Sequence, residues 1–299
     1  MEVRLGVAPI AWSNDDLPEL GGDTSLETCL AESRLAGYCG VETGGKFPQT
    51  SAELKPILAR HGLALASGWF SGTLLTNDVE NEIERIAPKL TLLRECGAPV
   101  IFYGETAGTI QNIRDAPLAT RPKMADEDFP AYGRKMTALA EHCATNGLAL
   151  AFHHHMGTAI ESEREVDLLM NHSGEALGLL FDTGHILFAG GDPLRMAKNH
   201  GPRINHVHAK DVRGDVVSRI DKHKWSFLDC VLEGVFTVPG DGMIDFFAVA
   251  RRLAEIGYEG WVIVEAEQDP AKANPLQYSR IGFGAMIAAL TAAGYEITN

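Results

Sequence analysis

The chain alternates between short apolar segments and helix-like segments along its length. Five helix-like segments end at a glycine that is followed by an apolar segment: Gly37, Gly62, Gly97, Gly147 and Gly257. Glycine is favoured there because the residue that ends a helix often adopts a left-handed conformation. Strictly alternating strands and helices imply parallel strands joined by right-handed crossovers. We count eight strand–helix units, which predicts a closed (β/α)8 TIM barrel.

An open, doubly wound sheet is the alternative arrangement for such a chain. These sheets usually have a glycine-rich phosphate-binding loop after their first strand. Here Pro9–Ser13 occupies that position, and the G-x-G pattern at Gly282–Gly284 precedes no nucleotide-binding pattern. The barrel is therefore the favoured fold. A barrel also accommodates residues 1–299 as a single domain.

The strand and helix boundaries follow from apolar runs and capping residues. The expected strands are Leu5–Ile10, Cys39–Thr43, Leu63–Ser67, Pro99–Tyr103, Leu148–His155, Leu179–His185, Ile204–Asp211 and Trp261–Glu267. Helix starts are expected at the pairs Thr24 and Glu27, Thr50 and Glu53, and Asn77 and Glu80. Two long connections, Gly104–Asp128 and Val212–Asp245, follow strands and so fall on the barrel face where active sites are built. They are either functional rims or neutral insertions.

The segment Ile204–Asp211 has the highest concentration of histidine and charged residues among the expected strands. His206 and His208 alternate with apolar residues and therefore share one face of a strand, with Lys210 and Asp211 at its end. Three other expected strands end in similar residues: His153–His155, Asp182 with His185, and Glu265 with Glu267. Strand ends that deliver His, Asp and Glu to one barrel mouth predict a metal site and an enzyme.

Charge and cysteine usage restrict the partners and the compartment. The formal net charge is −14, which disfavours nucleic acid or an anionic membrane as a partner. The five cysteines are widely spaced and odd in number, which favours reduced thiols and a cytoplasmic location. The N-terminus lacks a signal-peptide profile, and Ile281–Gly294 is too short to span a bilayer. A homo-oligomer stays possible.

Several motifs resemble those of a known superfamily. They are Phe181–His185, His206–Asp211, Val238–Asp245 and Gly257–Glu265. Together, and in this order, they resemble the xylose isomerase-like barrels, a group of sugar isomerases, epimerases and apurinic endonucleases. Phe152–Thr158 and Val264–Pro270 are similar to the inosose (2-keto-myo-inositol) dehydratases of that group. The resemblance covers nearly the whole chain.

The resemblance implies one divalent ion held by side chains from strands five to eight. Asp182, His208 and Glu265 match three of the superfamily's ligands. Relatives often have Glu at the fourth position, where this chain has His153, which either coordinates the ion or holds water or substrate. Two imidazoles and two carboxylates suit Mn²⁺ or Co²⁺, and also Fe²⁺, better than Mg²⁺. Glutathione is a further cofactor associated with the dehydratases, and no residue pattern here indicates it.

The dehydratase resemblance implies a hydro-lyase of inositol catabolism that acts on a cyclic polyol ketone. The expected steps are abstraction of the α-proton, an enediolate stabilised by the metal ion, and loss of the β-hydroxyl, which convert 2-keto-myo-inositol to a trihydroxycyclohexane-1,2-dione. His155 and His185 are the candidate base and acid, because histidine titrates near neutral pH. Lys210 or Lys46 is the candidate to polarise the departing hydroxyl or stabilise the enolate.

Other residues near the strand ends have weaker assignments. Trp12, Glu42 and Lys46 are candidates for binding substrate, each with a structural role as the alternative. His206 lies deeper than His208, which favours a packing or supporting role. His154 alternates onto the opposite face of its strand and is expected to be structural.

Three other functions compete with the dehydratase. A metal-dependent sugar isomerase or epimerase would share the enediolate, but the related isomerases use paired Glu residues as proton shuttles, and this chain lacks the Glu of strand five. An apurinic endonuclease is disfavoured by the net charge of −14 and by the shortage of extra metal ligands. A non-enzymatic sugar-binding protein would have no reason to keep so many convergent ligands.

Overall fold

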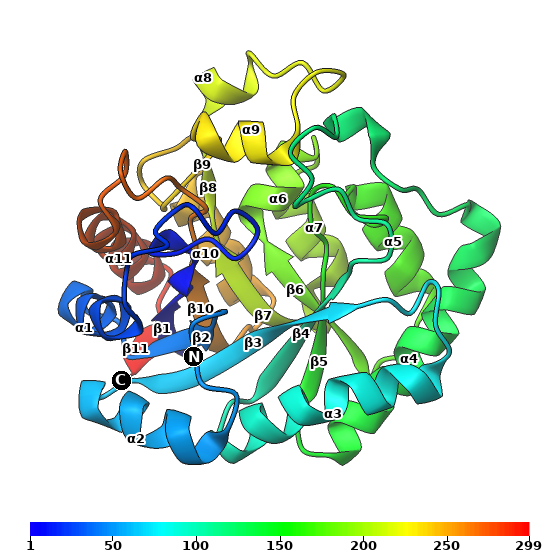
Figure 1. The fold of residues 1–299 in the computed structure, drawn as a ribbon, viewed down its shortest axis with the longest axis horizontal. Coiled ribbons are helices and arrows are strands. Elements are labelled where there is room, and N and C mark those ends of the chain that lie inside the picture. The colour runs from blue at the N-terminus through cyan, green and yellow to red at the C-terminus, as the bar shows by residue number, and fades with distance from the viewer. Residues whose placement is uncertain (299) are drawn as a thin grey trace.

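A parallel barrel forms the centre of the molecule. In the computed structural model, which describes residues 1–298, eight strands close into this barrel (Figure 1). They are β1 (Glu2–Val7), β2 (Gly40–Thr43), β3 (Ala64–Gly72), β4 (Val100–Glu105), β5 (Ala149–His153), β6 (Leu177–Asp182), β7 (Ile204–Ala209) and β10 (Gly260–Val264). The parallel pairing of β10 with β1 completes the closure. The predicted (β/α)8 barrel is therefore confirmed.

Helices surround the barrel (Figure 1). They are α1 (Leu26–Ala36), α2 (Ser51–His61), α3 (Val79–Glu95), α4 (Phe129–Thr145), α5 (Glu163–His172), α6 (Thr183–Phe188), α7 (Pro193–His200), α10 (Phe246–Glu255) and α11 (Pro275–Ala292). The five glycines that mark helix ends in the sequence all have positive φ, between 62° and 114°. A β-carbon would be strained in that conformation, which explains why glycine ends these helices. Among residues 1–298, no helix is long and apolar enough to cross a membrane.

Some predicted boundaries are wrong by short distances. Ser25 caps α1 and Asp78 caps α3, each one residue after the predicted caps Thr24 and Asn77. In both places two neighbouring residues have side chains that can accept the capping hydrogen bond, so the sequence alone did not separate them. The first strand ends at Val7, before the 3-10 helix Pro9–Ala11. Proline fixes φ and lacks the N–H that a strand would need.

The strand predicted over Leu179–His185 ends early. β6 stops at Asp182 and α6 begins at the next residue, so His185 lies in a helix. Asp182 Oδ1 accepts a hydrogen bond from the backbone N–H of His185 at 2.7 Å and caps α6. Similarly, β7 ends at Ala209, and Asp211 begins a separate short strand.

The two long connections meet each other on the rim of the barrel. The connection after β4 contains the 3-10 helices Leu118–Thr120 and Asp126–Asp128. The connection after β7 contains β8 (Asp211–Val212), α8 (Gly214–Val217), α9 (Phe227–Leu232) and β9 (Phe236–Thr237). The backbone N–H groups of Leu118 and Ala119 donate to Trp225 O (2.9 Å) and Lys222 O (2.8 Å). The connections therefore form one continuous wall.

The barrel interior changes from apolar to polar along the strands. Ala151, Leu180 and Ile263 are buried apolar residues, and the residues two positions later are His153, Asp182 and Glu265. Residues two apart in a strand share a face. The polar layer therefore lies on the same inner side, at the carboxyl ends of the strands. One strand not expected from the sequence, β11 (Glu296–Thr298), pairs with β1 outside the closed barrel.

Candidate active site

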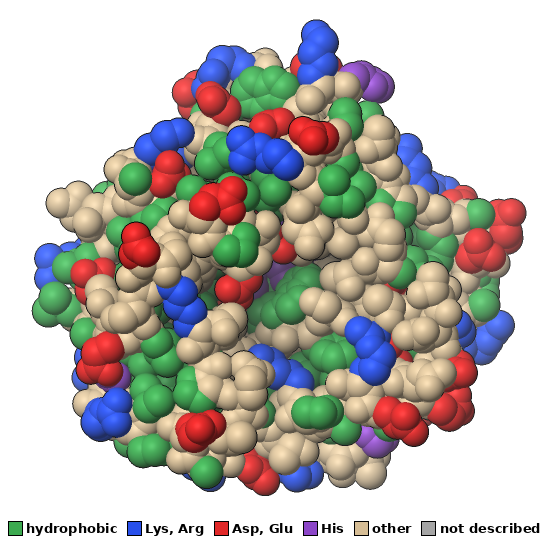
Figure 2. Space-filling view, viewed as in Figure 1, with side chains coloured by type: hydrophobic (Ala, Val, Ile, Leu, Met, Phe, Trp, Pro, Cys, Tyr) green, Lys and Arg blue, Asp and Glu red, His purple; other side chains and the backbone are tan. Residues whose placement is uncertain are grey.

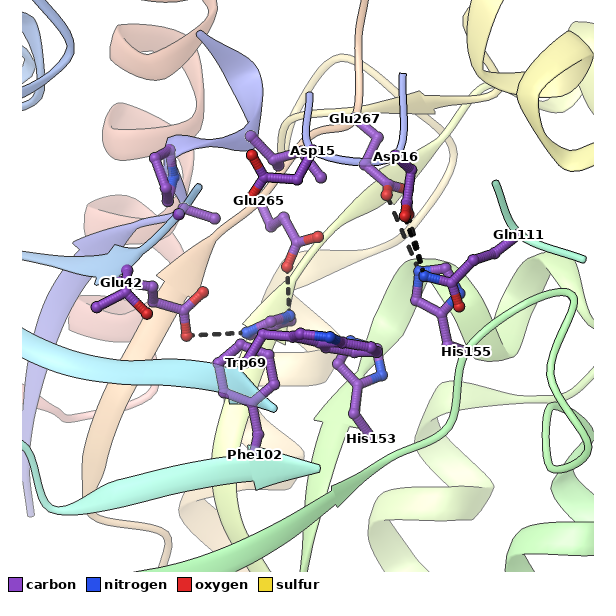
Figure 3. A pocket seen from close by; sticks show the side chains of 16 residues that line it. Asp15, Asp16, Glu42, Trp69, Phe102, Gln111, His153, His155, Glu265 and Glu267 are labelled. Atoms are coloured by element: carbon purple, nitrogen blue, oxygen red, sulfur yellow. Dashed lines mark hydrogen bonds and ion pairs between the residues drawn. The ribbon is translucent and has the colours of Figure 1, made fainter. Parts of the chain in front are cut away.

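Four side chains from the carboxyl ends of β5, β6, β7 and β10 converge inside the barrel mouth. His153, Asp182, His208 and Glu265 are all buried, and one ligand-type atom of each lies within 4.8 Å of the others. Asp182 Oδ2 is 3.5 Å from His208 Nδ1 and 3.8 Å from His153 Nε2. Glu265 Oε2 is in close contact with His208 Nδ1. We call these four residues the ligand cluster; Figure 3 labels His153 and Glu265 of this group.

The polar atoms of the ligand cluster fit a divalent cation. Asp182 Oδ2 is buried and has no hydrogen-bond partner within residues 1–298, while His208 Nδ1 and Glu265 Oε2, also buried, face each other in a close contact. Buried polar atoms without partners are costly, and two buried carboxylates without a cation are costlier still. An ion bound between these atoms would satisfy all three. Two imidazoles and two carboxylates are also a common donor set for transition metals.

The tautomer of His153 fits a fourth ligand. His153 Nδ1 lies 2.9 Å from the carbonyl oxygen of His154, an acceptor, so Nδ1 carries the hydrogen. Burial, and then the neighbouring His208 and His155, hold the pKa of His153 well below its usual range. The ring is therefore neutral, and its lone pair at Nε2 faces Asp182.

Glu42 holds His208 in the matching orientation. Its Oε1 accepts hydrogen bonds from His206 Nε2 (2.8 Å), His208 Nε2 (3.1 Å) and Ser67 Oγ (2.5 Å). Burial alone would raise the pKa of Glu42, but His208 and His206 lower it to about 2. Since His208 donates through Nε2, its Nδ1 is directed at the ligand cluster. The structure thus places Glu42 beneath His208, and Glu42 also lines the pocket.

A pocket of about 120 Å³ opens above the ligand cluster. Figure 2 shows the corresponding hollow near the centre of this face. Trp69 and Phe102 form an apolar wall, and Asp16 and Gln111 lie across the pocket from them (Figure 3). Gln111 Nε2 donates to Asp16 Oδ2 at 3.1 Å. These four residues were not singled out from the sequence, because apolar, amide and lone acidic residues in strands and loops have no distinctive spacing.

A second group of polar side chains forms another part of the pocket wall. His155 and Glu267 line the pocket, with His155 Nε2 3.9 Å from Glu267 Oε1. Burial alone would lower the pKa of His155, but the interaction with Glu267 raises it. The ring of His185 packs against His155 with 4.0 Å between centroids, and His185 is not among the pocket-lining residues. His155 therefore faces the pocket, and His185 lies behind it.

Lys210 is buried behind the pocket wall. Its Nζ lies 2.8 Å from Glu265 Oε1 and 3.3 Å from Glu267 Oε2, and it donates to His185 Nε2 at 2.9 Å. Burial alone would lower the pKa of Lys210, but Glu265, Glu267 and Asp182 raise it, so the side chain is an ammonium. Lys210 has no exposed surface and does not line the pocket among the described residues. Its contacts with pocket-lining residues are therefore those with the carboxylates of Glu265 and Glu267.

Two candidates for substrate binding lie elsewhere. Trp12 Nε1 donates to Glu32 Oε2 at 2.6 Å, and Lys46 Nζ donates to the carbonyl oxygens of Gly21 (3.0 Å) and Gly22 (2.9 Å). Both residues line a separate small cavity and not the central pocket. The structure does not bring these two side chains to the ligand cluster.

The remaining predicted positions have structural surroundings. His206 lies beneath His208 and shares Glu42 with it. His154 is fully buried, and neither ring nitrogen has a hydrogen-bond partner within the described part of the chain. Asp211 accepts hydrogen bonds from the backbone N–H groups of Val212, Gly240, Gly242 and Ile244, so it orders the connection after β7.

Comparison with known families agrees with this geometry. The family model described as "Xylose isomerase-like TIM barrel" matches residues 30–294. The chain belongs to this xylose isomerase-like TIM barrel family.

Two curated relatives are similar to the chain over nearly its whole length. The rhizopine catabolism protein MocC of Rhizobium meliloti is 52% identical over 300 residues, which cover 100% of this chain and 92% of that protein. The inosose dehydratase of Geobacillus thermodenitrificans is 44% identical over 280 residues, covering 93% of this chain and 94% of that enzyme.

Solved structures of other proteins share the fold at low sequence identity. A sugar phosphate isomerase/epimerase from Parabacteroides distasonis has a TM-score of 0.69 at 15% identity and covers 98% of this chain and 96% of its own. The IolI protein, solved with a zinc atom, has a TM-score of 0.69 at 16% identity and covers 97% of this chain and 98% of its own. The resemblance to the xylose isomerase-like barrels and to the inosose dehydratases is thus confirmed, as is the prediction of a dehydratase-type enzyme.

Proposed function

We propose that this xylose isomerase-like barrel dehydrates 2-keto-myo-inositol to a trihydroxycyclohexane-1,2-dione in inositol catabolism. The observation that carries the proposal is one pocket with a metal-type ligand cluster at its floor and the His155–Glu267 pair on its wall. Removal of an α-proton needs an electrophile at the carbonyl and a nearby base. Relatives named inosose dehydratase support the choice of substrate.

The cofactor that we propose is one Mn²⁺ or Co²⁺ ion held by His153, Asp182, His208 and Glu265. Such an ion supplies Lewis-acid stabilisation of the negative charge that develops on the ketone oxygen. Glutathione stays a prediction from the resemblance alone, and no step below uses it. The polar pocket wall positions the ring hydroxyls, with Asp16 and Gln111 as hydrogen-bonding partners.

Two pocket-lining residues would move the protons. We assign Glu267 as the base that removes the α-hydrogen, since its carboxylate lines the pocket beside His155. His155, with its raised pKa, would donate a proton to the β-hydroxyl, which leaves as water. The resulting enol then tautomerises to the dione. Trp69, Phe102 and Phe227 surround these groups with apolar surface; the Phe227 and His155 ring centroids lie 5.2 Å apart.

The raised pKa of His155 gives a pH dependence with a defined sign. The acid form is present below the folded-state pKa and is lost as the pH rises through it. We therefore expect kcat/KM to fall on the alkaline side of this pKa. Glu267→Gln removes the charge that raises the pKa, so NMR titration of the imidazole should give a lower pKa in the variant than in the wild type. An unchanged titration would remove the basis for His155 as the acid.

The charge of the pocket predicts rejection of anionic substrates. Its described lining contains no lysine or arginine and includes five carboxylates: Asp15, Asp16, Glu42, Glu265 and Glu267. Placing like charges together in a desolvated site costs several kcal/mol. Phosphorylated ketoses should therefore bind roughly a hundredfold or more weakly than the uncharged cyclic ketone. Competition assays with both compounds at several salt concentrations measure this difference, and equal inhibition by the two would contradict it.

The fate of the α-hydrogen tests the proposed function. In D₂O, a dehydratase should convert the cyclic ketone to a product that has lost one hydroxyl group, as followed by proton NMR. An epimerase would instead return deuterium to the α-carbon and keep every hydroxyl. Recovery of deuterated, fully hydroxylated ketone as the sole product would therefore replace the dehydratase assignment with an epimerase.

A further inference from the structure

The ammonium of Lys210 lies at a position surrounded by metal-type donors. Three of them are Glu265 Oε1, His185 Nε2 and Glu267 Oε2, at 2.8, 2.9 and 3.3 Å from Nζ. A neutral imidazole nitrogen and two carboxylate oxygens are the donor types that a divalent metal would take. His155, His185 and Glu267 alone already satisfy a metal-type arrangement, with one ligand atom of each within 4.8 Å of the others.

Glu265 connects this position to the ligand cluster. Its Oε2 faces His208 Nδ1, and its Oε1 faces Lys210. Asp182 Oδ2, another atom of the ligand cluster, is 3.8 Å from Lys210 Nζ. A carboxylate with one oxygen toward each of two cations is the arrangement of two-metal sites, in which the ions are about 3.5–4 Å apart. Here one of the two cation positions holds an ammonium.

The neighbouring elements hold this lysine in place along its length. A β-carbon at Gly184 would lie 2.6 Å from Lys210 Cγ, so only glycine at the start of α6 lets the side chain pass. Thr183 Oγ1 donates to Lys210 O (2.7 Å) and accepts from Lys210 N (3.1 Å), which fixes the backbone. The ring of Phe236 covers Nζ, with 4.6 Å to the ring centroid. Contacts at the backbone, along the side chain and at Nζ thus fix the position of Lys210.

We propose that Lys210 is a positioning residue whose ammonium occupies a second cation position, so that the barrel binds one metal ion where its donors would otherwise bind two. The fixed charge balances Glu265 and Glu267 without a second ion. It leaves Glu265 Oε2 for the ligand cluster and holds Glu267 beside His155. The inference deepens the proposed function, on whose single-ion ligand cluster it rests.

Removing the ammonium should therefore create a metal site. Wild-type protein, stripped of metal and dialysed against Zn²⁺ or Co²⁺, should contain about one ion per chain, and Lys210→Ala about two, by elemental analysis. The double variant Lys210→Ala/His185→Ala should return to about one, because His185 belongs to the second position alone. In the Co²⁺ forms, the second ion should add ligand-field absorbance to the visible spectrum.

A control at a partly buried lysine separates this effect from the loss of a hydrogen-bonded lysine in general. Lys135 Nζ donates to the carbonyl oxygens of Leu74 (3.1 Å) and Asn77 (2.7 Å) and has no metal-type donors among its described hydrogen-bond partners. Lys135→Ala should keep the wild-type metal content. Lys210→Met, which refills the space without charge, should also bind about one ion.

The outcomes distinguish the inference from the function on which it rests. A wild type without bound metal would refute the ligand cluster itself. A wild type with one ion and a Lys210→Ala variant that also binds one would refute the second cation position. If Lys210→Ala does not fold without metal, adding Zn²⁺ during expression should restore folded protein for this variant. The same addition should not improve the folding of Lys210→Met. Equal failure of both variants with and without Zn²⁺ would also overturn the proposal.

Discussion

Asp182→Asn should abolish metal binding and lower turnover of the cyclic ketone by roughly a thousandfold or more, since a Lewis-acid ion contributes several kcal/mol of transition-state stabilisation. Asp182 Oδ2 contacts both histidines of the ligand cluster and has no hydrogen-bond partner within residues 1–298. Its other oxygen, Oδ1, caps α6. Asparagine keeps an oxygen for the cap and replaces the ligand oxygen with an amide, so the variant should fold.

Asp192→Asn is the matched control for this variant. Asp192 caps the following helix, α7, through Oδ1, which accepts from Leu194 N at 2.9 Å, and it does not line the pocket. Its replacement should leave both metal content and turnover near the wild type. Elemental analysis and steady-state kinetics on the same preparations measure both. Full metal content in Asp182→Asn would show that the ligand cluster is not the metal site.

His155→Gln should lower turnover by roughly a hundredfold or more while the metal content stays at the wild-type level. In the proposed mechanism His155 donates the proton, and it lines the pocket next to Glu267 but lies outside the ligand cluster, so its replacement should leave the proposed metal site intact. The loss should appear in kcat more than in KM, because a proton is donated in the transition state.

His200→Gln provides a control histidine with a carboxylate partner. His200 Nε2 lies 2.6 Å from Asp167 Oδ1, and the pair joins α7 to α5 away from the pocket lining. This variant should retain turnover. A His155→Gln enzyme with wild-type kcat would assign the acid to another group, of which Asp16 is the pocket-lining carboxyl with a pKa raised by burial.

The fold was predictable because its signals are local. Glycines at helix ends and apolar runs after them recur along the chain, and each reflects the geometry of one helix end or one strand. The error at His185 had a physical reason. Asp182 ends a strand and caps the next helix without any intervening loop, so an apolar run followed by Asp-Thr-Gly-His showed no boundary.

The site was predictable only where strand ends deliver polar residues in a family pattern. The sequence suggested His153, Asp182, His208 and Glu265, and the structure brings these four together. The contact of Glu42 with His206 and His208 spans more than 160 positions and depends on closure of the barrel. The burial of Lys210 behind Glu265 likewise depends on packing from several elements, so neither role has a sequence signal.

The most direct test of the proposed dehydratase is incubation of the metal-loaded protein with 2-keto-myo-inositol. We predict a new dione absorbance, a product lighter by one water in mass spectrometry, and loss of both when the metal is removed. Free ketohexoses should show negligible turnover under the same conditions. Efficient epimerisation of ketohexoses, with the cyclic ketone left untouched, would contradict the dehydratase assignment and establish an isomerase in its place.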